Sequence, residues 1–271
     1  VTFVENRTEG QKSYFTVLDT HETNTKDGPS KNVAIANMKV DSHLVGKLSE
    51  GSQDLSIGRR RELFSIINTA VEHHCDLLVL PELSVPNQWI DLLAFECRKH
   101  NLAIVAGLTY ICNPQRYAFN VVATLLPVNV NGFSSCAVRL RVKNHYAPAE
   151  INELQGYRFK IPTYKTAVYD MFHWRNLYFT VYNCFELACI EDRALFKSEV
   201  DLIIATELNK DTSYFSEVVG SWVRDLHCYF IQVNTSEYGD SRIMKPSSRD
   251  ERNMVVVSGG KNAVALVEDI N

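Results

Sequence analysis

The sequence predicts an α/β fold within a single domain. Apolar runs of five or six residues alternate with helical segments in the first half of the chain, an alternation typical of α/β proteins. Several short strands separated by turns follow in the middle, and further strand and helix patterns close the chain. With 271 residues, 45% of them hydrophobic, the chain can bury one large core.

The elements of the first half follow from apolar spacing and from a helix cap. Ser56 is a suitable N-cap for a helix that continues through His74, because apolar residues recur there at helical spacing. The strand expected next is a nearly continuous apolar run, as in a sheet that is covered on both faces. In order, we expect strand, helix, strand, helix and strand at 32–37, 56–74, 76–80, 87–100 and 102–107.

The rest of the domain is expected to be richer in strands. Two further helices are expected, from about residue 191 and at about 214–227. Strands are expected at 119–126, 134–142, 166–170, 177–182, 200–205, 229–233, 254–258 and 263–267. These α/β units on either side of a β-rich middle belong to one domain.

Residues 1–30 are expected to form an N-terminal extension or linker, and residues 31–271 to form the folded domain. The stretch 21–30 is polar and ends in Gly28, Pro29 and Ser30, which are typical of loops. Because the sequence opens on Val1 and not on methionine, we also expect it to be cut from a longer chain or processed.

Composition excludes several classes of protein. A net charge of −4 gives no bulk attraction to nucleic acid or to an anionic membrane, and no apolar run approaches the roughly 20 residues of a membrane-spanning helix. The seven cysteines are scattered, without a CxxC pair or zinc-ligand spacing, and no secretory signal opens the sequence. We therefore expect free thiols in the cytoplasm, with no metal or organic cofactor.

Three reactive side chains each follow a predicted strand: Glu82, Lys143 and Cys184. Functional groups collect at such positions in α/β sheets. A carboxylate can take the proton of a thiol, and a fixed ammonium can stabilise the negative charge that develops on a carbonyl or nitrile under attack. Each residue alone has a plain structural interpretation, but together they form a chemical set for nucleophilic catalysis.

Four segments around these residues resemble the signature segments of the nitrilase, or carbon–nitrogen hydrolase, superfamily, in the family's order and with similar spacing. The first ends at Glu82, the second begins before Lys143, and the third contains Cys184. They read Asp76-Leu77-Leu78-Val79-Leu80-Pro81-Glu82, Val142-Lys143-Asn144-His145-Tyr146-Ala147-Pro148, Asn183-Cys184-Phe185-Glu186 and, late in the chain, Asn234 to Pro246. The resemblance covers residues 31–270.

The resemblance implies an α-β-β-α sandwich that often dimerises. It implies that Glu82 is the general base, Cys184 the nucleophile and Lys143 the oxyanion stabiliser, with the Phe185 N–H as a second donor. A second glutamate usually follows the lysine segment in this family. Glu150 is the nearest match and Glu153 the alternative, because the spacing is one residue shorter than the common amidase spacing.

The sequence departs from the family around the expected substrate pocket. Asn183 stands where an apolar residue usually precedes the cysteine, and the segment 206–209 replaces one that often carries proline and tryptophan. His145, Phe185 and Asn209 are expected to contact substrate, although His145 can equally serve to orient its loop. These departures leave the substrate open.

Other reactive residues have simpler interpretations. Cys189 lies just after Cys184 and is expected to be a packed core residue. His73 and His74 are neighbours near a helix end, and neighbouring side chains on a helix point in different directions, which does not favour a metal site. Glu186 is a candidate for supporting the catalytic residues.

The predicted function is hydrolysis of a non-peptide C–N bond, in an amide or carbamoyl group in preference to a nitrile, through a thioester intermediate. The expected partners are a small-molecule substrate and a second copy in a homodimer or higher oligomer. The alternative is a non-catalytic or restricted-substrate module for assembly or recognition inside a larger protein, since nitrilase-like domains also occur fused to bacterial antiphage defence reverse transcriptases.

Overall fold

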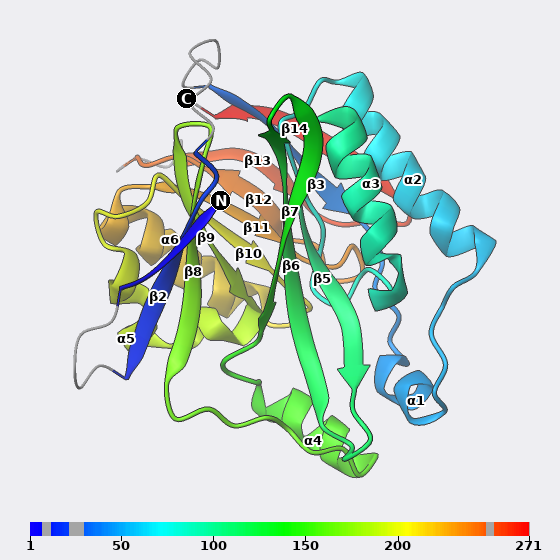
Figure 1. Cartoon of the computed structure of the whole chain (residues 1–271). Helices are drawn as coiled ribbons and strands as arrows, with labels where there is room; N and C mark the ends of the chain where they lie inside the picture. The colour runs from blue at the N-terminus through cyan, green and yellow to red at the C-terminus, as the bar shows by residue number, and fades with distance from the viewer. Residues whose placement is uncertain (7–11, 22–29, 248–251, 271) are drawn as a thin grey trace.

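Two β-sheets pack face to face, and helices cover the outer face of each one (Figure 1). The computed structural model describes residues 1–6, 12–21, 30–247 and 252–270. The central apolar cluster takes side chains from both sheets, for example Ile35 and Val105 from one and Phe179 and Ile204 from the other. This arrangement confirms the predicted α-β-β-α sandwich.

The larger sheet has eight strands in the order β1-β2-β8-β9-β10-β11-β12-β13. Its central strands β9, β10 and β11 are parallel, so their carboxyl ends lie at one edge. The strands are β1 (Thr2–Asn6), β2 (Ser13–Asp19), β8 (Ala167–Trp174), β9 (Leu177–Asn183), β10 (Leu202–Thr206), β11 (Tyr229–Val233), β12 (Ser241–Met244) and β13 (Asn253–Val257).

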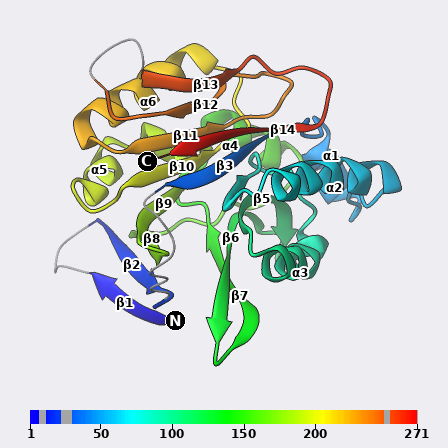
Figure 2. The same cartoon turned by 90° about the horizontal axis from the view of Figure 1, so that it is seen from above.

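The smaller sheet has six strands in the order β14-β3-β4-β5-β6-β7, and its strands β3, β4 and β5 are parallel. Figure 2 shows the two sheets from above, as layers between the helices. The strands are β3 (Lys31–Asn37), β4 (Leu77–Val79), β5 (Ala103–Cys112), β6 (Ala118–Val130), β7 (Phe133–Val142) and β14 (Val264–Ile270).

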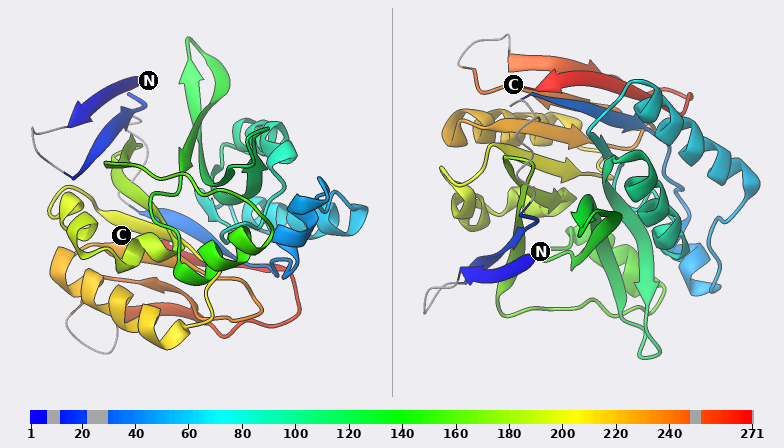
Figure 3. Two further views of the ribbon diagram at one scale, coloured as in Figure 1. Left: turned by 90° about the horizontal axis from the view of Figure 1, so that it is seen from below. Right: turned by 45° about the horizontal axis from the view of Figure 1, so that its top comes forward.

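The helices belong to two outer layers and to one end of the molecule. Helices α2 (Ile57–Glu72) and α3 (Ile90–His100) cover the smaller sheet, while α5 (Ile190–Arg193) and α6 (Thr212–Leu226) lie over the larger one. The short helices α1 (Leu44–Ser49) and α4 (Pro148–Gly156) lie at the end that Figure 3 shows from below. Single 3-10 turns occupy Asn87–Trp89, Cys184–Ala188 and Ala194–Phe196.

The cap predicted for α2 is confirmed. The Ser56 hydroxyl accepts a hydrogen bond from the Arg59 N–H at 3.1 Å and so satisfies one of the free N–H groups at the start of the helix. The apolar spacing read from the sequence also holds, because Leu63, Ile66 and Ile67 are fully buried against the smaller sheet.

The N-terminal residues correct the predicted linker. Strand β2 pairs in parallel with β8, strand β1 pairs with β2, and Phe15 and Leu18 are buried. The strand that pairs with β2 is some 150 residues away in the sequence. The apolar alternation of β2 is short and is flanked by polar residues, so the sequence pattern did not predict a strand there. Most of the predicted loop at 21–30 falls on residues 22–29, which lie outside the described residues.

None of the helices within the described ranges combines the length and apolar character that crossing a membrane requires.

Candidate active site

Glu82 lies in a tight turn after β4, held against the neighbouring strand β5. Leu83, the next residue, has a positive φ of 54°, and the N–H groups of Ser84 and Val85 both donate to the Gly107 carbonyl. A Cβ placed on Gly107 would lie only 2.3 Å from the Glu82 Cα. Glycine at 107 is therefore required for the turn that positions Glu82.

Lys143 follows β7 directly, and its ammonium lies between two carboxylates. Its Nζ is 2.7 Å from Glu82 Oε1 and 2.7 Å from Glu150 Oε2. Glu150 is in the first turn of α4, which begins at Pro148, whereas Glu153 on the same helix is exposed. Of the two glutamates that the sequence left open, Glu150 is the one beside Lys143.

Asn120 links the two carboxylates and was missed by the sequence analysis. Its Nδ2 is 2.8 Å from Glu82 Oε1 and 2.8 Å from Glu150 Oε1. Its Oδ1 accepts a hydrogen bond from Asn183 Nδ2 at 2.9 Å. The asparagine that replaces an apolar residue before the cysteine is thus part of a buried hydrogen-bonded chain leading to the two glutamates.

Cys184 begins the 3-10 turn after β9 and has a positive φ of 49°. Such a backbone conformation is uncommon for residues other than glycine and is often found at functional sites. The residue is only 6% exposed. The charges of Glu82 and Lys143 both act on the pKa of its thiol. The catalytic roles of these three residues stay predictions.

A buried ion pair fixes this turn to the lysine segment. Glu186 accepts two hydrogen bonds from the Arg141 guanidinium, at 2.7 and 2.8 Å. It also accepts from the N–H of Asn144 at 2.6 Å and from the N–H of Asn183 at 2.7 Å. Residues on both sides of Cys184 and Lys143 are therefore held by one carboxylate, which fits the supporting role expected for Glu186.

The electrostatics of the site follow from its burial. Burial raises the pKa of the Cys184 thiol well above its usual value, and the Glu82 carboxylate raises it further, while Lys143 opposes the shift. Burial also raises the pKa of Glu82, against the effect of Lys143. Burial would lower the pKa of Lys143, but the carboxylates of Glu150 and Glu82 outweigh it and raise that pKa. At neutral pH the resting site therefore holds a thiol and an ammonium.

Glu207 is a further buried carboxyl group whose charge acts on the Cys184 thiol, and the sequence analysis did not single it out. It follows β10, and burial raises its pKa to about 8. Gln232 Nε2 lies 3.1 and 3.0 Å from its two oxygens. The next N–H, that of Leu208, donates to Glu82 Oε2 at 3.0 Å. The loop after β10 thus carries both a further acid and a direct support for Glu82.

The residues expected to contact substrate lie in different surroundings. Phe185 is half-buried against the apolar cluster beneath α6. Asn209 stabilises its own loop, because its Oδ1 accepts from the Asp211 N–H and its N–H donates to Asn234 Oδ1. His145 contacts Asp192 at 2.7 Å. Their roles toward a substrate stay predictions.

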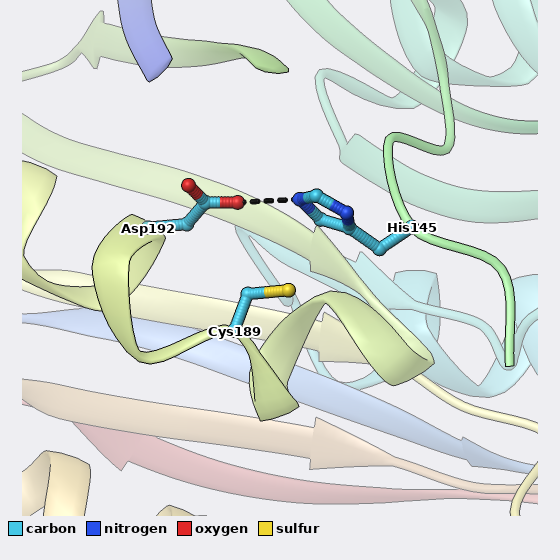
Figure 4. A group of neighbouring side chains, drawn as sticks. All are labelled: His145, Cys189 and Asp192. Carbon is cyan, nitrogen blue, oxygen red and sulfur yellow. Dashed lines mark hydrogen bonds and ion pairs between the residues drawn. The ribbon is translucent and has the colours of Figure 1, made fainter. Parts of the chain in front are cut away.

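Cys189 differs from the prediction. It is half-buried and not a core residue, and it lies beside His145 and Asp192 (Figure 4). The turn that begins at Cys184 ends before Cys189, and Figure 4 shows the Cys189 side chain on the side where His145 and Asp192 lie.

A cavity of about 420 Å³ lies between α1 and the start of α2, and Leu83 and Tyr110 belong to its lining, which includes neither Lys143 nor Cys184. The Tyr110 hydroxyl donates to Glu150 Oε1 at 2.9 Å. The cavity therefore shares a wall with the carboxylate cluster.

Solved structures with the same arrangement define the class of this fold. XC1258 from Xanthomonas campestris, a CN-hydrolase superfamily protein with an arsenic adduct in its active site, is 13% identical, with a TM-score of 0.60, over 89% of this chain and 91% of that chain. A mutant of the amidase from Nesterenkonia sp. AN1, with the acetamide moiety of fluoroacetamide on its active-site cysteine, is 15% identical, with a TM-score of 0.58, over 89% and 90%.

The glutamine-dependent NAD+ synthetase from Acinetobacter baumannii is 14% identical, with a TM-score of 0.57, over 89% of this chain. This chain spans about half of the synthetase, 46% of its length. No family model and no curated protein matches the sequence. The fold is that of the CN-hydrolase, or nitrilase, superfamily, as the four segments predicted.

Proposed function

We propose that this protein is a cysteine-dependent hydrolase that cleaves the C–N bond of a small amide or carbamoyl compound. The observation that carries the proposal is the buried cluster in which Lys143 contacts both Glu82 and Glu150 beside the strained turn of Cys184. The low exposure of Cys184 favours a small substrate. The predicted dimer and cytoplasmic location stay predictions.

Attack begins with a proton transfer, because the raised pKa of Cys184 keeps it a thiol at neutral pH. Glu82 takes this proton as the sulfur bonds to the carbonyl carbon. Carboxylates take two of the three N–H groups of Lys143, and the third stabilises the oxyanion. Glu150 and Asn120 hold Lys143 and Glu82 in position and do not need to touch the reacting atoms.

The tetrahedral intermediate then collapses with loss of the amine. Glu82 returns its proton to the leaving nitrogen, which leaves a thioester on Cys184. Glu82 next takes a proton from water, the water oxygen bonds to the thioester carbon, and the proton returns to the sulfur. One water is consumed, and a carboxylic acid (or carbamic acid, from a carbamoyl group) and an amine or ammonia are produced.

The test compares Cys184→Ala with wild type on a panel of small amides and N-carbamoyl compounds, with ammonia or amine release as the readout. Turnover should fall by at least about 10⁴-fold, because the covalent step is lost. Mass spectrometry of wild type quenched during turnover should find the acyl group on the peptide that contains Cys184.

Cys228→Ala is the matched control, because it removes a buried sulfur that lies outside the site. Turnover by Cys184→Ala at the wild-type rate, or an acyl group on another cysteine, would refute the assignment of the nucleophile. If wild type turns over nothing in the panel and forms no acyl-enzyme, the proposed activity is wrong.

A further inference from the structure

Cys189, His145 and Asp192 form a second cluster of reactive side chains, outside the catalytic set. Their ligand atoms all lie within 4.8 Å of one another. His145 Nε2 is 2.7 Å from Asp192 Oδ2, and Figure 4 shows the Cys189 sulfur pointing toward this pair. His145 comes from the loop between β7 and α4, and Cys189 and Asp192 come from the N-cap and the body of α5. The proposed hydrolysis uses none of the three.

We propose that this cluster binds a transition-metal cation through Cys189, His145 and Asp192, and that Zn²⁺ is the preferred ion. Thiolate sulfur, imidazole nitrogen and carboxylate oxygen are the donor atoms that Zn²⁺ takes in proteins. Three protein ligands leave a fourth tetrahedral position for water. This proposal differs from the sequence-based expectation of no metal, because the positions 145, 189 and 192 have none of the spacings by which zinc motifs are recognised.

The surroundings of Asp192 support a ligand role. The Tyr169 hydroxyl donates to Asp192 Oδ2 at 2.8 Å, and the Tyr182 hydroxyl donates to the Asp192 carbonyl at 2.9 Å. Hydrogen bonds of this kind orient metal ligands and are costly to remove from metal sites. The carboxylate is held before any ion binds.

Access to the site is also suitable. The Asp192 side chain is 7% exposed, whereas that of His145 is 35% exposed and Cys189 is half-buried. The cluster is therefore buried on the side of Asp192 and reaches solvent on the side of His145. A hydrated cation can enter from the solvent side and keep one water.

The distances indicate what must move when the ion binds. In a tetrahedral zinc site with bonds of about 2.0–2.3 Å, ligand atoms lie roughly 3.3–3.6 Å apart. The His145–Asp192 pair is closer than this, because the two atoms share a proton. The ion replaces that proton and the Cys189 thiol proton, and a side-chain adjustment of about 1 Å completes the site.

An ion bound at this cluster would have ligands close in the sequence to Lys143 and Cys184. His145 lies two residues after Lys143, and Cys189 lies five residues after Cys184. A metal ion bound by His145, Cys189 and Asp192 would link the loop after Lys143 to the segment that follows the Cys184 turn. Since the ion binds only the folded chain well, it should also raise the thermal unfolding temperature.

The experiment measures Zn²⁺ binding to the full chain by equilibrium dialysis with metal analysis, in a Cys184→Ala background. Removing Cys184 excludes zinc held by the catalytic sulfur and makes the result independent of turnover. We expect one Zn²⁺ per chain, with a Kd below about 10 μM. Cys189→Ser and His145→Gln should each weaken binding by at least about 100-fold.

Cys112→Ser is the matched control, since Cys112 is an exposed cysteine outside the cluster, and it should bind as tightly as its parent. With Co²⁺ in place of Zn²⁺, a thiolate-to-metal absorption band should appear and be lost in Cys189→Ser. Circular dichroism checks that each variant is folded. The proposal is overturned if the parent binds no zinc at this affinity, or if folded Cys189→Ser and His145→Gln variants bind as it does.

Discussion

Cys184 and Cys189 lie five positions apart, yet the fold places their sulfur atoms in opposite environments. Cys184 is 6% exposed, in a strained turn, with an ammonium and a carboxylate acting on its thiol. Cys189 is half-buried, beside a partly exposed histidine and a carboxylate. The comparison teaches that backbone conformation and burial, and not residue type or neighbourhood in the sequence, decide what a cysteine can do.

The ion pairs of the two regions differ in the same way. The Lys143 side chain is 1% exposed and the Glu82 side chain is 3% exposed. Because neither charge reaches water, each one is stabilised by its ion-pair partner. The His145 side chain is 35% exposed and retains water. Breaking the first pair should therefore cost far more than breaking the second.

The largest effect is expected for Lys143→Met, which keeps the length of the side chain and removes its charge. Two buried carboxylates then lose their cation, which should lower the free energy of unfolding by about 3–5 kcal/mol. Turnover should fall by at least about 10³-fold, because the oxyanion donor is lost. Urea denaturation at pH 8 and pH 5 is the measurement.

The loss should be smaller at pH 5 than at pH 8, because the carboxylates protonate more readily without the ammonium. If Lys143→Met lowers the free energy of unfolding by less than about 1 kcal/mol at pH 8, the buried Lys143 pair does not contribute more to stability than the partly exposed His145 pair.

Glu207→Gln tests whether burial keeps the Glu207 carboxyl group protonated in the folded protein. The pKa of Glu207 is about 8 in the folded protein and near 4.5 when unfolded, so the folded state holds the proton more tightly. The stability of wild type should fall as pH rises from about 4.5 to 8, since the unfolded chain ionises first. The variant should lack this slope and should be more stable at pH 8 by on the order of 3 kcal/mol.

The measurement for Glu207→Gln is the free energy of unfolding at several pH values between 4.5 and 9. Glutamine retains a partner, because its amide can face that of Gln232. Parallel pH profiles for variant and wild type would show that Glu207 is not held protonated by its surroundings.

Gly107→Ala tests whether the Glu82 turn depends on its close contact with β5. The new Cβ would meet the Glu82 Cα at 2.3 Å, which backbone movement alone can relieve. We expect a loss of about 1–3 kcal/mol in unfolding free energy and roughly 10²-fold in turnover. Gly156→Ala, where no atom lies within 4 Å of the new Cβ, should leave both close to wild type.

The smallest effect is expected for His145→Gln in the presence of a chelator. The variant loses a partly exposed pair with Asp192, which contributes roughly 1 kcal/mol or less. If His145 orients its loop and does not contact substrate, turnover should change by no more than a few-fold, whereas a raised KM would indicate substrate contact. A cost as large as that of Lys143→Met would mean that burial does not account for the difference between the two regions.

The sequence was informative where local patterns are strong. Glu82, Lys143 and Cys184 were selected because each follows a strand that the sequence indicates, in segments that resemble a known family. Asn120 could not be predicted, because it sits within β6 and its role depends on contacts with residues from three other segments. Strand β2 was missed for a similar reason, since its pairing partner is remote in the sequence.

The position of Cys189 shows the same limit. Its place just after Cys184 favoured a core assignment, but the three-dimensional path of the loop after β7 brings His145 beside Cys189 and Asp192. Side-chain clusters built from separate segments of the chain produce no periodic pattern in the sequence.

Glu82 and Lys143 extend from the six-stranded sheet, whereas Cys184 extends from the eight-stranded one. Neither half of the sandwich contains all three residues of the proposed catalytic set. During folding, the thiol meets its charged companions only after the two halves dock, a step dominated by contacts between distant parts of the chain. In a newly made or partly folded chain the Cys184 thiol is therefore exposed and lacks the burial that raises its pKa, and it meets Glu82 and Lys143 only in the finished tertiary structure.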